Sequence, residues 1–175
     1  MVATWVSLPF LFLKGNEMNE NLKVDDYGLE LLEKFEGKRH QAYRDSVGIP
    51  TIGIGFIRYT LGDKAGQKVQ MGDVMTDSEI RAELTSQIQT YEKAVRDAVQ
   101  VELTQSQFNA CVSLCYNIGA KAFAGSSVVR ELNQRKYQAA CKSFALWNKA
   151  GGRVVQGRSI VVRKSRKSFS GTVRP

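Results

Sequence analysis

One long amphipathic segment, from Thr76 to Val99, sets the architecture that this chain can adopt. Thr76 and Glu79 have the spacing of a capping box, so a helix is expected to begin there. Apolar residues then recur every three or four positions, as they do along one face of a helix. This apolar stripe consists of Ile80, Leu84, Ile88, Tyr91, Val95 and Val99. The segment predicts one long helix that connects the parts of the fold before and after it.

Further helices are expected on both sides of the long one. The first spans about Val24 to Gly37, where Gly37 occupies the usual C-terminal position, and its stripe consists of Leu29, Leu32 and Glu36. A second capping box begins at Thr104 and predicts a helix with Phe108, Cys111, Val112 and Cys115 on one face. Two more helices are predicted over residues 121–134 and 136–149, before the glycine pair at 151–152.

Between the first helix and the long one, the apolar pattern changes to a period of two. Residues 45–48 read as a turn, and residues 51–57 alternate as a strand does. The fold class is therefore α+β and mostly α, with a small hairpin lobe (about 21–75) and a helical lobe (about 76–170) joined by the long helix. Residues 1–20 are expected to be an extension outside this domain, and residues 171–175 to be the end of a basic tail.

Composition fits a single globular domain and excludes several classes. The chain has 175 residues, of which 43% are hydrophobic, and no apolar run approaches the ~20 residues of a membrane span. Three cysteines are too few for a disulfide framework, which favours a reducing compartment. With one histidine, His40, there is no multi-histidine metal site, and we expect no cofactor.

The two ends of the chain differ in character. Met1 to Leu13 is apolar, but its first lysine follows the apolar stretch, unlike a secretory signal; Met18 is a candidate natural start, and a weak export or tethering signal stays open. Residues 132–175 hold 11 Lys/Arg and no acid, whereas residues 1–131 hold 14 Lys/Arg and 17 Asp/Glu. Such a basic end favours anionic partners, namely nucleic acid, anionic lipid or the bacterial cell wall.

Two carboxylates and a hydroxyl stand out as candidates for chemistry: Glu36, Asp45 and Thr51. Glu36 lies on an apolar stripe in the last helical turn, where the helix dipole and partial burial would both raise its pKa, as a general acid requires. Asp45 in a hydrated turn should be ionised and suited to positioning water. Thr51 shares its strand face with two glycines, which would leave room for a ligand. Two carboxylates in contrasting surroundings beside a groove are typical of glycoside hydrolysis.

The residues around these positions resemble the phage lysozymes of glycoside hydrolase family 24. The resemblance covers about Leu22 to Gly157 and includes the spacing of Glu36, Asp45 and Thr51. Its motifs are Phe35–Gly37, Ala42–Asp45, Thr51–Gly55, Tyr116–Gly119, Ala122–Ser126, Leu132–Asn133 and Trp147–Gly152.

The resemblance implies a muramidase that cuts the β-1,4 bond between N-acetylmuramic acid and N-acetylglucosamine, with inversion. Glu36 would donate the proton, Asp45 would position the water and Thr51 would support it. Substrate contacts would fall on Ile57, Tyr116, Ser126 and Lys142. From the residues alone, Tyr116 reads as a core aromatic and Ser126 as a helix cap. Phe56 stands where the family usually has His, and the segment after Gly157 departs from the family's closing helix.

The expected partners follow from this family. They are peptidoglycan glycan strands and, through the basic end, anionic outer-membrane or wall surfaces; nucleic acid is not expected, and a monomer is. The enzyme would accumulate in the host cytoplasm and reach the periplasm and wall at lysis. Two alternatives stay open: a cationic membrane-perturbing protein whose tail does the work, and a transglycosylase, which would need Glu36 but no Asp45.

Overall fold

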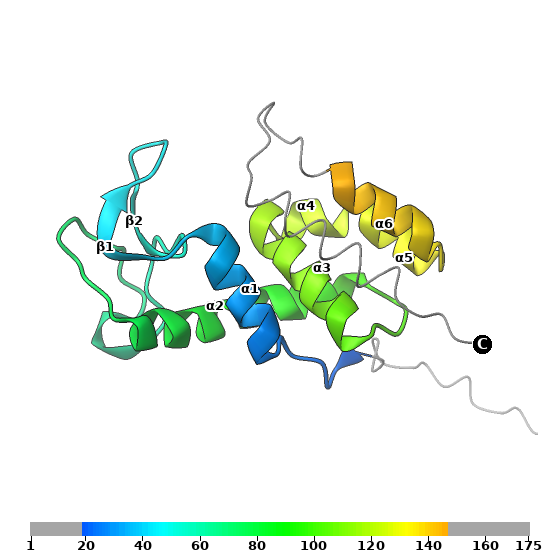
Figure 1. The fold of residues 1–175 in the computed structure, drawn as a ribbon, viewed down its shortest axis with the longest axis horizontal. Helices are drawn as coiled ribbons and strands as arrows, with labels where there is room; N and C mark the ends of the chain where they lie inside the picture. The colour runs from blue at the N-terminus through cyan, green and yellow to red at the C-terminus, as the bar shows by residue number, and fades with distance from the viewer. Residues whose placement is uncertain (1–18, 147–175) are drawn as a thin grey trace, which may run out of the picture.

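Helix α2 (Asp77–Ala98) runs along the lower side of the view in Figure 1, from below the hairpin to behind α3, and so reaches both lobes. The computed structural model describes residues 19–146. The capping box predicted at Thr76 is present, because the Thr76 side chain accepts from the Glu79 N–H and the Glu79 carboxylate accepts from the Thr76 N–H. The predicted stripe faces inward, and of its six members all but half-buried Tyr91 are fully buried.

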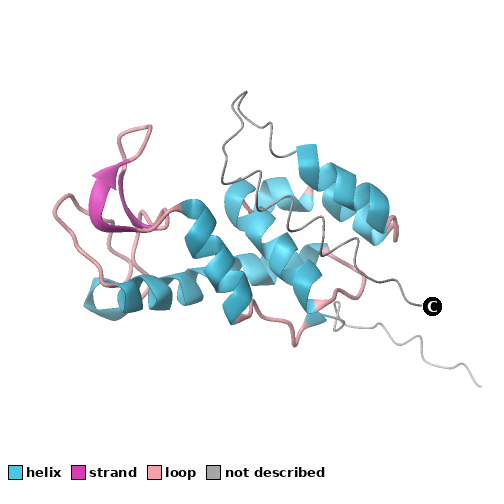
Figure 2. Ribbon diagram, viewed as in Figure 1, coloured by secondary structure: helices cyan, strands magenta, loops and turns pink. Residues whose placement is uncertain are grey.

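The helical lobe is formed by α1 (Asp26–Glu36), α3 (Gln105–Ile118), α4 (Ala120–Ala124), α5 (Ser127–Asn133) and α6 (Tyr137–Leu146), with part of α2 (Figures 1 and 2). The second capping box, at Thr104, opens α3 as predicted. The face predicted for α3 is fully buried, including both of its cysteines, which are free thiols.

The single helix predicted over residues 121–134 is wrong, because the chain forms two short helices there. Ser126 lies between them in an extended conformation, and its side chain accepts a hydrogen bond from the Val129 N–H at 3.2 Å. This local bond starts α5 afresh instead of letting α4 continue. The helix predicted over 136–149 is present as α6 up to Leu146, and residues 147–149 lie outside the described part.

The hairpin lobe contains a two-stranded antiparallel sheet of β1 (Arg39–Arg44) and β2 (Pro50–Gly53), followed by loops and the short 3-10 helix η2 (Gly62–Lys64) (Figure 2). The turn predicted at residues 45–48 is confirmed between the strands. The register places Thr51 opposite Tyr43. The strand predicted over residues 51–57 stops at Gly53, because Ile54 and Gly55 turn the chain back and Ile52 bridges to Phe56.

The segment before β1 attaches to the helical lobe and not to the hairpin. Asn19 is fully buried: its side-chain amide donates to the Val101 carbonyl at 2.9 Å and accepts from the Leu103 N–H at 3.0 Å. Asn109 of α3 donates to the Asp25 carboxylate at 2.7 Å. Asn19 thus packs with the segment that leads into α3, while the domain boundary itself stays a prediction. Leu29 and Leu32, on the apolar stripe of α1, are buried in the hydrophobic core.

Within residues 19–146, every helix is too short or too polar to cross a lipid bilayer. The Trp147–Gly152 motif, the glycine pair, the departure after Gly157 and the expected extension upstream of Asn19 lie outside the described residues.

Candidate active site

Glu36 is the last residue of α1, at the point where the chain leaves the helix for the hairpin. Gly37 ends the helix with a φ of +79°, a conformation that L side chains rarely adopt, so glycine is required there. Glu36 is exposed, so the partial burial expected from its place on the stripe is not observed. Its elevated pKa therefore stays a prediction that depends on the helix dipole and on neighbouring charges.

Asp45 organises the turn between β1 and β2. Its Oδ1 accepts from the backbone N–H groups of Val47 at 2.9 Å and Ile49 at 2.8 Å. Its own N–H donates to the Ile49 carbonyl at 3.0 Å, and its carbonyl accepts from the Gly48 N–H at 3.0 Å. Asp45 is half-buried, and both of these side-chain bonds use Oδ1 and not Oδ2. One oxygen thus holds the turn while the other is available to water or substrate.

Thr51 is tied to the same turn. Its side chain is buried, and Oγ1 donates to the Ile49 carbonyl at 3.0 Å. The Ile49 residue therefore joins the two candidates, because its N–H binds Asp45 and its carbonyl binds Thr51. Since the Thr51 proton is engaged, its hydroxyl oxygen can only accept a further hydrogen bond.

The glycine pair after Thr51 does not form the bare strand face that the sequence suggested. A Cβ at Gly53 would lie 2.5 Å from the ring of Phe56, and Gly53 has a φ of +66°. Phe56, which occupies the position of the family's usual histidine, is 1% exposed. The ring therefore covers Gly53, and only Gly55 has open space beside it.

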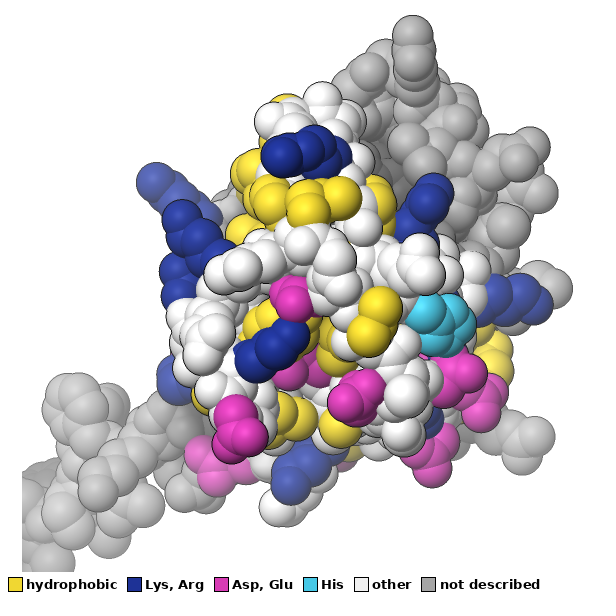
Figure 3. Space-filling model, turned by 90° about the vertical axis from the view of Figure 1, so that its left-hand side faces the viewer, with side chains coloured by type: hydrophobic (Ala, Val, Ile, Leu, Met, Phe, Trp, Pro, Cys, Tyr) yellow, Lys and Arg dark blue, Asp and Glu magenta, His cyan; other side chains and the backbone are white. Residues whose placement is uncertain are grey.

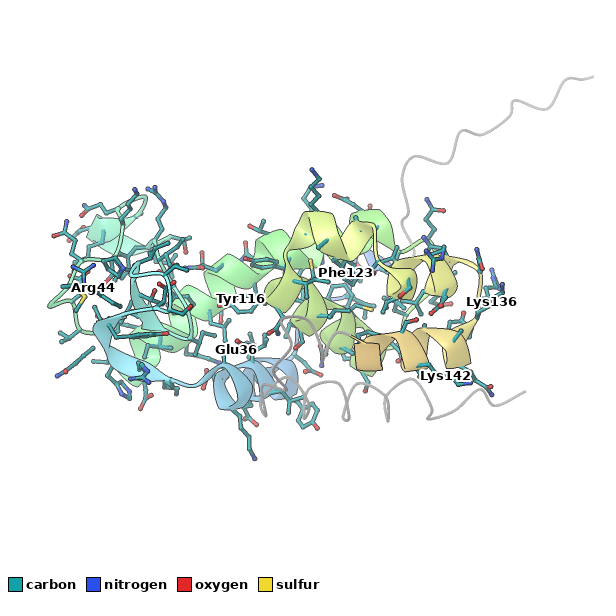
Figure 4. All side chains as sticks on the ribbon, turned by 90° about the horizontal axis from the view of Figure 1, so that it is seen from above. Glu36, Arg44, Tyr116, Phe123, Lys136 and Lys142 are labelled. Atoms are coloured by element: carbon teal, nitrogen blue, oxygen red, sulfur yellow. The ribbon has the colours of Figure 1, made fainter. Side chains whose placement is uncertain are left out.

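Tyr116 connects the two lobes beside Glu36. Its hydroxyl, on α3, donates to the Ile54 carbonyl in the hairpin lobe at 3.2 Å, and its ring meets Tyr91 edge-on at 5.0 Å. Burial raises the pKa of the Tyr116 hydroxyl, and the negative charge of Glu36 raises it further. Figure 4 shows Glu36 and Tyr116 near each other in the middle of the molecule. Tyr116 is therefore a neutral hydroxyl next to the candidate acid.

The other predicted substrate contacts lie in different settings. Ile57 is 51% exposed on the loop after the hairpin. Ser126 is 4% exposed and caps α5, as its residue type alone suggested. Lys142 is exposed on α6, and Figure 4 places it at the far end of the helical lobe from Arg44, with Glu36 between them. The structure thus brings Tyr116 to Glu36, and it does not bring Lys142 there.

A group of charged residues that includes Glu33, three positions before Glu36, was not predicted from the sequence. Glu33 of α1 forms ion pairs with Arg81 of α2 at 3.0 Å and with Lys38 at 3.1 Å. Arg81 lies 48 positions from Glu33 in the chain, so no local pattern predicts their contact. The one available signal is an acid three residues before the candidate acid, on the same helical face.

Comparison with known proteins connects this site to one family. Residues 33–167 match the family model described as phage lysozyme. The endolysin of Salmonella phage P22 is 42% identical over 130 residues, which are 74% of this chain and 86% of that protein. The endolysin of Bacillus phage PZA is 34% identical over 137 residues, or 78% of this chain, and the match spans half of that protein's length.

Solved structures give the same result. An endolysin from Escherichia coli O157:H7 phage FAHEc1 superposes with a TM-score of 0.75 at 31% identity, over 89% of this chain and 98% of that one. The muramidase domain of SpmX from Asticaccaulis excentricus superposes with a TM-score of 0.73 at 28% identity, over 88% and 99% of the two chains.

Proposed function

The chain belongs to the phage lysozyme family, and we propose that Glu36, Asp45 and Thr51 carry out its chemistry. It is a glycoside hydrolase that cuts peptidoglycan, as the endolysins and muramidases similar to it do. Our proposal concerns the bond and the mechanism: hydrolysis of the β-1,4 bond between N-acetylmuramic acid and N-acetylglucosamine, with inversion at the anomeric carbon.

In this mechanism, Glu36 gives its proton to the glycosidic oxygen as the bond to the anomeric carbon breaks. A water molecule attacks that carbon from the opposite face of the sugar. Asp45 Oδ2 accepts one hydrogen of this water and takes up its proton, while Thr51 Oγ1 accepts the other hydrogen. The Thr51 hydroxyl is suited to this role because its own proton is already donated to the Ile49 carbonyl at 3.0 Å.

The observation that supports the proposal most directly is the common attachment of Asp45 and Thr51 to Ile49. A carboxylate whose Oδ1 is held by two backbone N–H groups is restrained from moving into bonding distance of a sugar. It is well placed to orient a water molecule. We therefore expect the Glu36 and Asp45 carboxyl groups to be ~6.5–9.5 Å apart, the range of inverting enzymes.

NMR of fresh digestion products tests the mechanism. Inversion of the β-linked glycan yields an α-anomer first, which then equilibrates. An initial β-anomer, or a trapped glycosyl-enzyme on Asp45, would contradict the water-positioning role.

The variant Glu36→Gln separates this function from the cationic alternative. It keeps size and polarity but removes the acid. The rate at which the variant hydrolyses outer-membrane-stripped Gram-negative cells should therefore fall by ~10²–10⁴-fold. Circular dichroism checks that the variant is folded. Killing or lysis that persists at the wild-type level in a folded variant would mean that the basic end of the chain does the work.

The enzyme acts on the cell wall, and we infer that it does so as a monomer released from the host cytoplasm at lysis. The substrate contacts at Ile57, Tyr116, Ser126 and Lys142, and a contact of the basic end with anionic surfaces, stay part of this proposal. Fractionation of host cells before and after lysis, with size-exclusion chromatography of the purified chain, tests the location and the oligomeric state.

A further inference from the structure

A continuous series of ion pairs joins α1 to the start of α2. Arg81 of α2 contacts Asp26 and Glu33 of α1, each at 3.0 Å. Lys38, just after α1, contacts Glu33 at 3.1 Å and Asp77 at 2.8 Å. His40 of β1 then contacts Asp77 at 3.1 Å. From Asp26 to Asp77 charges of opposite sign alternate along the series, and His40 at its end is a hydrogen-bond partner of Asp77 that carries a charge only when protonated.

Two members of this series, Glu33 and Lys38, flank the candidate acid Glu36 along the chain. Glu33 precedes Glu36 by three positions, so the two carboxylates lie on one face of α1 with their Cβ atoms ~5–6 Å apart. Lys38 follows Glu36 by two positions, on the other side of the glycine that ends the helix. The last turn of α1 is therefore fixed to α2 immediately before and immediately after Glu36.

The central charges of the series keep their ionised forms. Burial tends to raise the pKa of Glu33, but hydrogen bonds from Arg81 and Lys38 outweigh it and hold that pKa below the usual range. The pKa of Lys38 is raised by its hydrogen bonds to Asp77 and Glu33. Glu33 is also well shielded, with a side chain 16% exposed. A fixed negative charge thus lies one turn from Glu36, balanced by two fixed positive charges.

We propose that Glu33, held between Arg81 and Lys38, is the positioning residue for Glu36: it orients the last turn of α1 and sets the charge beside the acid. This inference rests on the proposed role of Glu36 as proton donor. It assigns to the junction of α1 and α2 a function in tuning the pH range of hydrolysis.

The signs of the expected effects follow from electrostatics. Glu36 works in its protonated form, so its pKa determines the basic limb of the pH profile. Loss of the Glu33 charge leaves Arg81 and Lys38 less balanced, which favours ionised Glu36 and moves the limb to lower pH. Loss of either positive charge leaves Glu33 less balanced and moves the limb to higher pH. A purely structural role would not produce shifts of opposite sign.

The test measures kcat and KM against pH on soluble, uncross-linked peptidoglycan strands at low salt. We expect Glu33→Gln to move the basic limb down, and Arg81→Gln to move it up, by about 0.5 pH unit, the size of a unit charge acting over one helical turn through a water-like medium. The double variant should return to within about 0.2 unit of wild type, because the two charge effects cancel. For Glu33→Gln, kcat should fall by about tenfold with little change in KM, since orientation of the acid affects the chemical step.

Several variants serve as controls. Lys93→Gln removes one member of an exposed pair on α2, with Asp97 at 2.6 Å, and should leave the limb in place. His40→Gln removes the imidazole at the end of the series. If the basic limb of the pH profile disappears in this variant, that limb reports the titration of His40 and not of Glu36, which would overturn the inference. If Arg81→Gln does not fold, Lys38→Gln provides the same upward shift from a residue outside the helices. Tyr116, which also faces Glu36, stays neutral because its pKa is raised.

The outcomes distinguish the inference from the proposed function. Shifts that are absent, or of the same sign in Glu33→Gln and Arg81→Gln, overturn the positioning role while an inactive Glu36→Gln still supports the acid. Full hydrolysis by folded Glu36→Gln overturns the proposed function itself. Shifts that shrink at high salt, where charges more than ~3–8 Å apart are screened, support the electrostatic account.

Discussion

The helical lobe is packed around phenylalanine and leucine side chains, whereas the hairpin lobe combines a smaller apolar core of Ile52, Ile54 and Phe56 with carboxylates that accept hydrogen bonds from its loops. In the helical lobe, Phe108, Phe123 and Phe144 are each at most 1% exposed. In the hairpin lobe, Asp73 accepts from the Tyr59 hydroxyl, the Gln70 N–H and Lys64. Buried Glu83 of α2 accepts from the Thr60 N–H and hydroxyl. The face at the hairpin end carries basic side chains around its edge and acidic ones across its lower half (Figure 3).

This difference suggests a division of labour. The exposed turn between the two strands lies outside this smaller core, so directed hydrogen bonds fix Asp45 and Thr51 there. The helical lobe supplies most of the stabilising apolar burial, and it carries Glu36 on a helix. We therefore expect mutations in the helical core to lower the free energy of unfolding, and mutations in the turn to lower the rate of hydrolysis.

The largest effect is expected for Asp45→Asn. Asparagine keeps an Oδ1 that can accept from Val47 and Ile49, so the turn should persist, but the charge that activates water is lost. Hydrolysis should fall by ~10²–10⁴-fold, while the melting temperature changes little. Ser46→Ala in the same turn is the matched control and should retain activity. Hydrolysis at the wild-type rate by Asp45→Asn would contradict the two-carboxylate mechanism.

Truncation in the helical core should show the opposite pattern. Phe108→Ala removes a fully buried ring, at an expected cost of about 3–5 kcal/mol in the free energy of unfolding. Below its melting temperature, the folded variant should hydrolyse walls within a few-fold of wild type, because Phe108 forms no part of the site. Urea denaturation and single-temperature rates measure the two quantities, with exposed Ser106→Ala on the same helix as control. An unchanged stability would contradict the packing account.

Acid should loosen the hairpin lobe first. Lysine, backbone and tyrosine donors hold the pKa of Asp73 below its usual range, and those of Asp77 and Glu79 are lowered by Lys38 and by Thr76 respectively. Such groups stabilise the fold above their unfolded pKa of ~4, and that contribution is lost as pH falls through the lower folded values. Amide hydrogen exchange between pH 6 and pH 3 should therefore accelerate in residues 59–79 before it does in α3. Simultaneous loss of protection in both lobes would argue for one cooperative unit.

Removal of residues 1–17 should have the smallest effect. Every predicted site residue lies after Val24, and Asn19, the first described residue, already has buried contacts of its own to the segment before α3. Activity on stripped walls should be unchanged, and stability should change by no more than about 0.5 kcal/mol. Asn19→Ala offers the contrast, since it removes two bonds to the segment before α3. A large fall in the melting temperature of the truncated chain would show that the first residues pack into the fold.

The sequence predicted the elements whose signals are local. Capping boxes at Thr76 and Thr104 and the apolar stripe of α2 are contained within single helices, and each was confirmed. The predictions that failed concern places where the same local residues allow two conformations. After Gly53 the chain can extend the strand or turn back through the backbone bonds between Ile52 and Phe56, and at Ser126 it can continue the helix or cap a new one.

In the site, the spacing of the residues was predicted and their contacts were not. The spacing of Glu36, Asp45 and Thr51 is visible in the sequence, but the attachment of Asp45 and Thr51 to one residue, Ile49, requires the folded turn. The pairing of Glu33 with Arg81 is a contact between distant segments. Burial of Glu36 was predicted from its place on the stripe, yet the residue is exposed, because it lies at the helix end that faces the junction of the lobes.

The contact between Gly53 and Phe56 also restricts the order in which this hairpin can evolve. While the phenylalanine is present, a Cβ at position 53 would lie 2.5 Å from its ring, so any residue other than glycine forces the ring to move. A smaller residue at position 56 removes this clash, and the φ of +66° then still favours glycine, asparagine or aspartate. The two positions thus form an epistatic pair, in which a mutation harmful in this background becomes acceptable in a lineage that first lost the ring.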